Sequence, residues 1–301
     1  MRTAPLLATV AALAIAAPIL SGCGAEEAAG VDVAQAASTT AGKGTARVKM
    51  TMAMEGLGLP SGLTLTADGV MSLRSPEGDL TFDFGDLLKL AGVDGNGAMK
   101  VRFKGGDLFV DPPDIPGLTV PDGWLEIDLA KVVSALGIDP MAAGRLFTID
   151  PASQLEVLSA AGNLTEVGKE EIDGVQTRHL KGAYSINDSL KALPPESAAQ
   201  VRTALERIRR LNPSAIDLDK KIPIELWVDD QSLVHRMKTA SELPSQNGTP
   251  AGTASVTVEL SDFGAPLDIS RPAGATDVTA KIVDALAQAG AVLGKSGSAG
   301  G

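Results

Sequence analysis

The single cysteine of this chain, Cys23, is the residue whose type and position point most directly to a chemical reaction. It ends the Leu-Ser-Gly-Cys segment 20–23, which directly follows an apolar run over residues 5–20. A charged start at Arg2, an apolar middle and small residues before a cut site form the pattern of a secretory signal. We therefore expect an exported chain in which the Cys23 thiol is placed for modification.

The segment 20–23 resembles the lipobox of bacterial lipoprotein signal peptides. The resemblance implies that the Cys23 thiol receives a diacylglyceryl group and that Cys23 becomes the first residue of the mature chain. Two acyl chains on one residue give stable membrane attachment. A buried free cysteine is the alternative, but small and polar residues follow it at 24–30 instead of a packed domain. A transmembrane span needs about 20 apolar residues, and the prolines at 5 and 18 break this run.

The remaining residues that could carry catalysis are few. The two histidines, His179 and His235, lie in separate predicted strands without metal-ligand spacing, and we interpret both as strand residues with ordinary polar partners. No Gly-x-Ser-x-Gly nucleophile elbow occurs. The segment 94–97, Asp-Gly-Asn-Gly, lacks the acidic residue that would complete a calcium loop and is typical of a hairpin turn. The sequence therefore predicts no enzyme, no cofactor and no metal site.

The charge balance limits the partners of the chain. Lys and Arg number 26 against 37 Asp and Glu, which gives a formal net charge of −11. An acidic surface repels nucleic acid and anionic lipid headgroups, so neither is expected to bind a basic patch. Membrane attachment is then expected to depend on the acyl chains at Cys23. With the one cysteine modified, no intramolecular disulfide can form, and stability must come from packing.

Alternation of apolar and polar residues predicts a sheet. Residues 45–55 alternate with a period of two, and the pattern returns in segments 63–73, 80–84 and 99–103. Strands resume at 163–172 and 175–184, joined by Asp173-Gly174, which is a strong signal for a two-residue hairpin turn. Three more strands are predicted in the segments 222–228, 233–239 and 256–260. An antiparallel sheet of about nine or ten strands with one wet face is the result.

Helices are predicted between and after these strands. Asp128 can cap a helix that carries Val132 and Leu136 on one side, and two further starts are Asp-Pro pairs at 139 and 150. A longer helix is predicted over about 195–211, and a last one over 277–293. The arginines of the 195–211 helix could meet an anionic headgroup, but a solvated helix face is the preferred interpretation. We expect a signal peptide at 1–22, a flexible tether at 23–43, one domain at 44–293 and a disordered tail at 294–301.

The methionines of the first strand indicate how an apolar ligand could be held. Met50, Met52 and Met54 share one face without a polar interruption, and unbranched, polarizable side chains adapt to apolar ligands of several shapes. Ordinary core packing is the alternative for each of them. A wide curled sheet covered only by short helices can leave an apolar space between its layers. The residues expected to line that space are Met50, Met52, Met54, Leu63, Leu65, Phe82, Phe84, Val132 and Leu136.

A family resemblance rests on the lipobox, on the segment 167–179, on the strand 222–229 with Pro223 and Trp227, and on the segment 234–237. With these features the chain resembles the actinobacterial cell-envelope lipoproteins of the LppX/LprAFG type, which share a fold with the periplasmic lipoprotein carrier LolA. The order of elements agrees over roughly residues 44–265. The resemblance implies an α+β fold in which a curved antiparallel half-barrel has short helices over its concave face. It also implies an apolar cavity that accepts acyl chains of lipids or lipoglycans.

Two functions of different classes follow from these features. The first is an extracytoplasmic lipoprotein, anchored to the cell membrane through Cys23, which binds or carries an acylated lipid or lipoglycan without covalent chemistry. The second is a structural lipoprotein with a filled core whose partner is another envelope protein. A long apolar cavity would favour the first function, and a filled core with an exposed apolar patch would favour the second.

Overall fold

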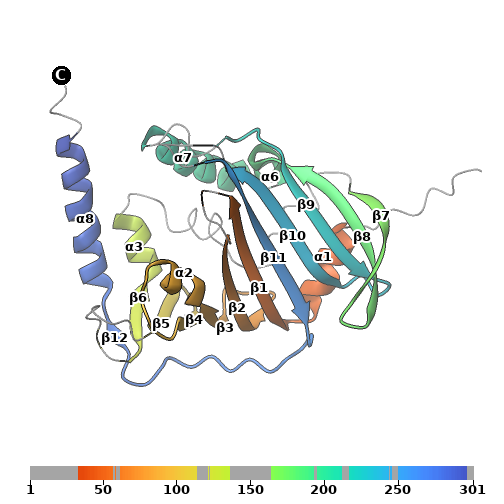
Figure 1. Ribbon diagram of the computed structural model, residues 1–301, viewed down its shortest axis with the longest axis horizontal. Coiled ribbons are helices and arrows are strands. Elements are labelled where there is room, and N and C mark those ends of the chain that lie inside the picture. Colours follow the sequence, from red (N-terminus) through yellow and green to blue (C-terminus); the bar gives the residue numbers. More distant parts are fainter. Residues whose placement is uncertain are drawn as a thin grey trace, which may run out of the picture. The chain divides into compact units, whose positions relative to one another are not determined.

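A single sheet of 12 strands organises the protein (Figure 1). The computed structural model describes residues 33–56, 58, 62–113, 121, 123–135, 164–192, 195–211, 217–243, 245 and 250–296. All its elements belong to the unit Val31–Gly301; the other unit of the chain, Met1–Gly30, lies outside the described residues. The strands are β1 (Thr45–Gly56), β2 (Leu63–Ser72), β3 (Gly78–Asp83), β4 (Ala98–Lys104), β5 (Asp107–Asp111), β6 (Leu125–Asp128), β7 (Thr165–Ile172), β8 (Val175–Tyr184), β9 (Ile222–Asp229), β10 (Val234–Leu243), β11 (Gly252–Ser261) and β12 (Thr276–Asp277). The helices are α1 (Val33–Gly42), α2 (Gly85–Leu90), α3 (Leu129–Ala135), α6 (Ile186–Ala192), α7 (Pro195–Leu211) and α8 (Thr279–Ser296).

The sheet consists of two antiparallel meanders that share a seam. Its strand order is β12-β6-β5-β4-β3-β2-β1-β11-β10-β9-β8-β7, so β1 to β6 form one meander and β7 to β11 the other. The seam is the antiparallel pairing of β1 with β11, and only β12 pairs in parallel, with β6. The sheet is curved and does not close on itself, which confirms the predicted α+β class with an antiparallel half-barrel.

The predicted hairpin between β7 and β8 forms as expected. Ile172 pairs with Val175, and the two residues between them have positive φ, +49° at Asp173 and +82° at Gly174. A turn with two left-handed residues matches the twist of the strands that it joins. The alternation that predicted the other strands is also confirmed, whereas β5, β6 and β12 exceed the nine or ten strands expected. β6 and β12 have four and two residues, too few for a period of two to be recognised, and the five-residue β5 was missed.

The sheet has one apolar face, defined here as the face that carries Ala46, Val48 and Met50 of β1. The main core lies between this face and α1, and it includes Val33, Ala36 and Ala37 of the helix. A separate small cluster joins α6 and α7, which lie at one end of strands β9 to β11 (Figure 1). Helices α3 and α8 pack on each other at the β6 edge of the sheet.

Helix α1 differs from the expectation of a flexible tether over 23–43. Its side chains Val33, Ala36, Ala37 and Thr40 are buried. The Thr40 hydroxyl donates to the Ala36 carbonyl at 2.7 Å and accepts the backbone N–H of Val234 on β10 at 3.0 Å. Composition alone suggested a linker because small residues are typical of both linkers and closely packed helices. The tertiary contact distinguishes the two.

Two other boundaries bear on the predicted organisation. Helix α7 has the predicted bounds, while α8 extends to Ser296 and therefore enters the segment 294–301 that was expected to be a disordered tail. Helix α2, between β3 and β4, was not predicted. The predicted helix starts at 139 and 150 lie outside the described residues, as do Cys23 and the signal segment 1–22. Among the described helices, none combines the length and the apolar character that a bilayer crossing requires.

Candidate functional site

The apolar face is continuous across the seam of the sheet because of the register of β1 with its two neighbours. Met52 lies opposite Leu65 on β2 and opposite Val256 on β11. Met54 lies opposite Leu63 on β2. Residues directly opposite each other on antiparallel strands have their side chains on the same face. Strands from both meanders therefore contribute to one apolar surface around Met52.

Burial on the apolar face decreases along β1 from Ala46 to Met52 and rises again at Met54, which is half-buried. The side chains of Ala46 and Val48 are fully buried, at 0% exposure, where the core with α1 is formed. Met50 is half-buried, and Met52 is 38% exposed. Its neighbours across the register, Leu65 and Val256, are half-buried. The part of the apolar face around Met52 is thus the part that an apolar ligand can reach.

Most of the residues predicted to line a cavity lie together on this face. The register brings Met50, Met52, Met54, Leu63 and Leu65 together on adjacent strands. All five come from β1 and β2, two paired strands in which directly opposite residues place their side chains on the same face.

The other predicted lining residues are placed differently. Phe82 on β3 lies opposite Ala67 of β2, and its ring stacks on Phe84 with 6.1 Å between ring centroids. Val132 is a half-buried residue of α3, which packs against β5 and β6 rather than against the Met52 region. Leu136 lies outside the described residues.

Sequence reasoning missed the contribution of the second meander to this face. The row of side chains that contains Met52 continues through Val256 on β11, Thr239 on β10 and Ile224 on β9. The alternation of Val256, Val258 and Leu260 is visible in the sequence and predicted a strand. Nothing local in that pattern indicates that β11 pairs with β1, about 200 residues earlier in the chain.

The outer face of the sheet carries His179 in a polar cluster. The His179 ring stacks on the Trp227 ring, with centroids 4.2 Å apart and planes 13° apart, and its Nε2 lies 2.7 Å from Glu225 Oε2. The Arg236 guanidinium lies 5.4 Å from the centroid of the same indole ring, and Trp227 Nε1 donates to Glu170 Oε2 at 2.7 Å. These contacts agree with the interpretation of His179 as a strand residue with ordinary polar partners.

Glu225 illustrates the electrostatic balance of that cluster. Burial favours its neutral form, but the hydrogen bonds from Lys181 and His179 and the charges of these side chains together outweigh burial, so the pKa of Glu225 is lowered. The carboxylate therefore stays ionised at neutral pH. A general acid would need the opposite shift.

His235 closes the turn between β9 and β10. Its Nε2 lies 2.9 Å from Asp229 Oδ2, and the other carboxylate oxygen accepts the backbone N–H groups of Gln231 and Leu233. Phe263 packs edge-on against the His235 ring, with 5.4 Å between centroids. Asp229 is thereby engaged by the turn, and this histidine also has a structural role.

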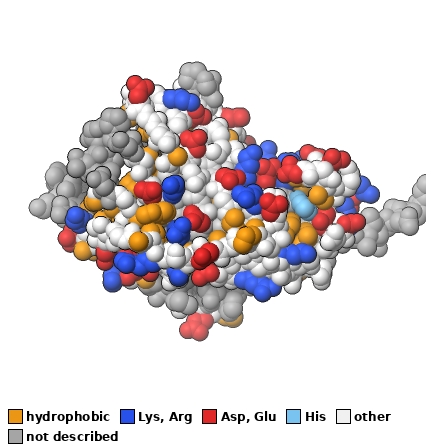
Figure 2. All heavy atoms as spheres, turned by 90° about the horizontal axis from the view of Figure 1, so that it is seen from below, with side chains coloured by type: hydrophobic (Ala, Val, Ile, Leu, Met, Phe, Trp, Pro, Cys, Tyr) orange, Lys and Arg blue, Asp and Glu red, His pale blue; other side chains and the backbone are white. Residues whose placement is uncertain are grey.

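Charges of both signs are mixed over the surface seen from below (Figure 2). On the outer face many of them form ion pairs, such as Arg236 with Glu259 and Arg102 with Asp79. No large patch of one sign stands out in this view.

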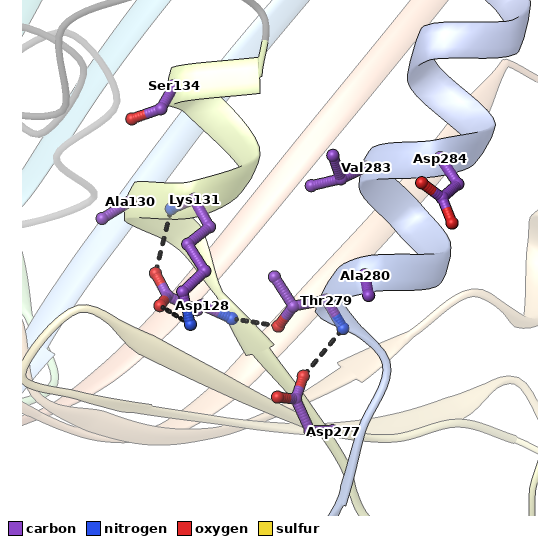
Figure 3. A pocket seen from close by; sticks show the side chains of 9 residues that line it. All are labelled: Asp128, Ala130, Lys131, Ser134, Asp277, Thr279, Ala280, Val283 and Asp284. Carbon is purple, nitrogen blue, oxygen red and sulfur yellow. Dashed lines mark hydrogen bonds and ion pairs between the residues drawn. The ribbon is translucent and has the colours of Figure 1, made fainter.

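A cleft of about 510 Å³ with mixed polar and apolar lining lies between α3 and α8 (Figure 3). Asp128 accepts the backbone N–H of Lys131 at 2.9 Å and pairs with its amine at 3.0 Å; these two interactions lower the pKa of Asp128. Asp277 accepts the backbone N–H of Thr279 at 2.8 Å, and the Thr279 hydroxyl accepts the N–H of Asp128 at 2.9 Å. The polar groups of the cleft therefore cap the two helices and attach α8 to β6.

The same cleft does not gather metal ligands. Val283 points toward α3, whereas Asp284 lies on the far side of α8 (Figure 3). Over the described ranges, no group of three or more His, Cys, Asp or Glu side chains is arranged to hold a metal ion. The polar groups of the cleft are engaged in capping α3 and α8, and the apolar face around Met52 is the candidate site considered for an apolar ligand.

Comparisons with known proteins identify similar chains without a matching family model. An uncharacterised 31.2 kDa protein of Streptomyces griseus is 25% identical over 261 residues, which cover 84% of this chain and 76% of the relative. Among solved structures, the lipoprotein LppX of Mycobacterium tuberculosis is 16% identical with a TM-score of 0.44, covering 79% of this chain and 96% of that one. LprF of Mycobacterium bovis is 16% identical with a TM-score of 0.43, covering 81% and 96%. The solved structures to which the chain is similar thus include the LppX and LprF type that the sequence resemblance names.

Proposed function

We propose that this protein is a lipid-anchored envelope lipoprotein that holds the acyl chain of an amphiphile on the apolar face of its sheet. The observation that supports the proposal is the burial gradient on that face, from fully buried Val48 to Met52, which is 38% exposed. Met52 is flanked on the same face by the half-buried Leu65 of β2 and Val256 of β11, so apolar side chains from both meanders contribute to this part of the face.

The driving force for such binding is the removal of apolar surface from water. It contributes about 25 cal/mol for each Å² buried, so a chain that buries about 200 Å² gains about 5 kcal/mol. The flexible thioether side chains of Met50, Met52 and Met54 suit chains of different length and unsaturation. No bond is made or broken in this function, and the partners of His179 and His235 support a non-enzymatic role.

The anchor at Cys23 would keep this site close to the membrane. Nine residues lie between Cys23 and Val33, where α1 begins, and an extended chain over these ten steps reaches at most about 35 Å. Helix α1 packs directly on the apolar face. A protein attached in this way samples the bilayer surface and can exchange an acylated lipid or lipoglycan with it. It is then extracytoplasmic and needs no basic patch.

The proposal is tested by native mass spectrometry and organic extraction of the full chain expressed in an actinobacterial host. We expect an acylated species in near-stoichiometric amount. The matched variants are Met52→Glu, which places a charge on the apolar face, and Thr51→Glu, which places it on the outer face of the same strand. Only Met52→Glu should lose the acylated species, because an unpaired carboxylate next to an acyl chain costs several kcal/mol.

Two outcomes would contradict the proposal. A wild-type chain that carries no lipid, even after incubation with envelope lipids, would favour a structural or partner-binding lipoprotein. Equal lipid content in the Met52→Glu and Thr51→Glu variants, both folded by circular dichroism, would show that the lipid binds elsewhere.

A further inference from the structure

Two rows of side chains on the apolar face, those that contain Met52 and Met54, are called the accessible rows after the exposed Met52. They change in chemical character from one side of the sheet to the other. On β1 and β2 these rows are entirely apolar, and this part is called the acyl sector: Met52 and Met54, with Leu65 and the buried Leu63 opposite them. On β8 and β10 the same face carries hydroxyl groups, and this part is called the hydroxyl sector: Tyr184, Thr239 and Ser241. The two sectors lie on one face with β11 between them, and β9 lies between β10 and β8 within the hydroxyl sector.

The register places the three hydroxyl residues on this face. Thr239 lies opposite Val256 of β11 and opposite Ile224 of β9, both of which belong to the apolar face. Ser241 lies opposite Ala254, which in turn lies opposite Met54. Tyr184, the only tyrosine in the chain, lies opposite Ile222 at the end of β8 and packs against the main core.

The three hydroxyls are half-buried and available. Within the described part of the chain, none of them makes a hydrogen bond with another residue, and none is sealed from solvent. Burial raises the pKa of the Tyr184 phenol, which therefore remains a hydrogen-bond donor at neutral pH. Polar groups in such a position gain from a ligand that supplies partners, because covering them without partners is costly.

The accessible rows also lack charge. Among the described residues of β1, β2 and β8 to β11, the register defines the members of each row. The Met52 row consists of Gly182, Ile224, Thr239, Val256, Met52 and Leu65, and the Met54 row of Tyr184, Ile222, Ser241, Ala254, Met54 and Leu63. None of them is charged. A phosphate or carboxylate placed here would lose its hydration without meeting a counter-ion among the residues of these rows. An uncharged headgroup would not.

We propose that the hydroxyl sector binds the uncharged polyol-ester headgroup of the ligand, with Tyr184 and Thr239 as specificity-determining residues, while its acyl chain lies along the acyl sector. The inference rests on the proposed function and adds the orientation and the headgroup class of the ligand. An acylated glycerol or sugar has this chemistry. Its ester carbonyl and hydroxyl groups match the three hydroxyls, each of which can both donate and accept.

The test measures binding of three pyrene-labelled probes with the same alkyl chain, supplied from phosphatidylcholine vesicles, to the full lipidated chain. The probes are a diacylglycerol, a phosphatidic acid and an alkane without a headgroup. We expect the wild type to bind the diacylglycerol about tenfold more tightly than the phosphatidic acid. The double variant Tyr184→Phe/Thr239→Val should reduce that preference to about twofold, because each lost hydrogen bond contributes about 0.5–1.5 kcal/mol. Binding of the alkane should not change.

The control variant is Thr257→Val, which removes a hydroxyl from the outer face of β11 and should leave the preference unchanged. If the double variant does not fold, Ser241→Ala, which removes a single hydroxyl, is measured in its place. An unchanged preference for diacylglycerol in the Ser241→Ala variant contradicts the inference. Equal binding of diacylglycerol and phosphatidic acid by the wild type overturns the inference alone. Failure of all three probes to bind the wild type overturns the proposed function as well.

Discussion

Replacing Thr40 by Val tests whether α1 belongs to the folded domain. The Thr40 side chain is 0% exposed. Its hydroxyl accepts the backbone N–H of Val234 at 3.0 Å and donates to the Ala36 carbonyl at 2.7 Å. Valine keeps the shape and the β-branch, so helix propensity and packing change little. The substitution therefore isolates the hydrogen bond between α1 and β10.

The magnitude follows from the group that loses its partner. The Val234 N–H would remain buried without an acceptor, which costs about 1–3 kcal/mol. For a domain of this size, about 2–4 °C of Tm correspond to each kcal/mol, so we expect Tm to fall by about 2–12 °C. The Ala36 carbonyl is not orphaned, because the backbone of α1 can still donate to it.

The assay is thermal and urea unfolding of the mature chain followed by circular dichroism. The matched control is Thr39→Val, one residue earlier, where the hydroxyl only accepts an exposed contact from Gln35 at 3.1 Å. This control should change the free energy of unfolding by less than about 0.5 kcal/mol. If Thr40→Val is no more destabilising than Thr39→Val, the docking of α1 on β10 is refuted, and residues 33–42 would function as the tether expected from composition.

Three further predictions concern an ion pair at α6, the close packing of β2 against β3, and the anchor at Cys23. The pKa of Asp188 is held well below its usual range by hydrogen bonds from Lys221 and other groups. The stabilising effect of this carboxylate is therefore complete above the unfolded-state pKa near 4 and is lost as the pH falls below it. Asp188→Asn should destabilise the protein at pH 7 and progressively less toward pH 2, and a loss of stability that is independent of pH over this range would contradict the prediction. Gly69→Ala should strongly destabilise the protein because the new Cβ would lie 2.0 Å from the backbone oxygen of Asp79 on β3. Gly42→Ala, with open space around it, should be neutral or slightly stabilising. Similar urea midpoints for the two variants would show that β2 and β3 are not so closely placed at Gly69. Cys23→Ala should move the protein from the membrane fraction to the aqueous phase in detergent phase separation, and a variant that stays with the membrane would exclude the acyl anchor.

Several elements could be predicted from the sequence because they depend on local patterns. The alternation in β1 and β2 sets which residues share a face, whatever strand pairs with them. Asp173-Gly174 specifies its turn through two residues that tolerate positive φ. The apolar spacing in α7 likewise predicted a helix with the observed bounds. The anchor at Cys23 is a prediction of the same local kind.

The composition of the candidate site depended on tertiary structure. Pairing of β1 with β11 joins segments about 200 residues apart and brings Val256 beside Met52. The pairing of β8, β9, β10 and β11 likewise places Thr239 and Tyr184 on the apolar face. No sequence motif indicates the headgroup binding that we propose for their hydroxyls. Helix α1 is a similar case, since its small residues suit a linker and a packed helix equally well.

By itself, the sequence determined the two-faced strands and their turns, since each of these depends on neighbours within a few residues. The export signal is a prediction of the same local kind. Tertiary structure alone decided which strands meet at the seam, where α1 packs, and that burial falls from Val48 to Met52 along one strand. The physical reason is that periodicity specifies the face of a side chain, whereas burial on that face depends on what packs over it from distant parts of the chain.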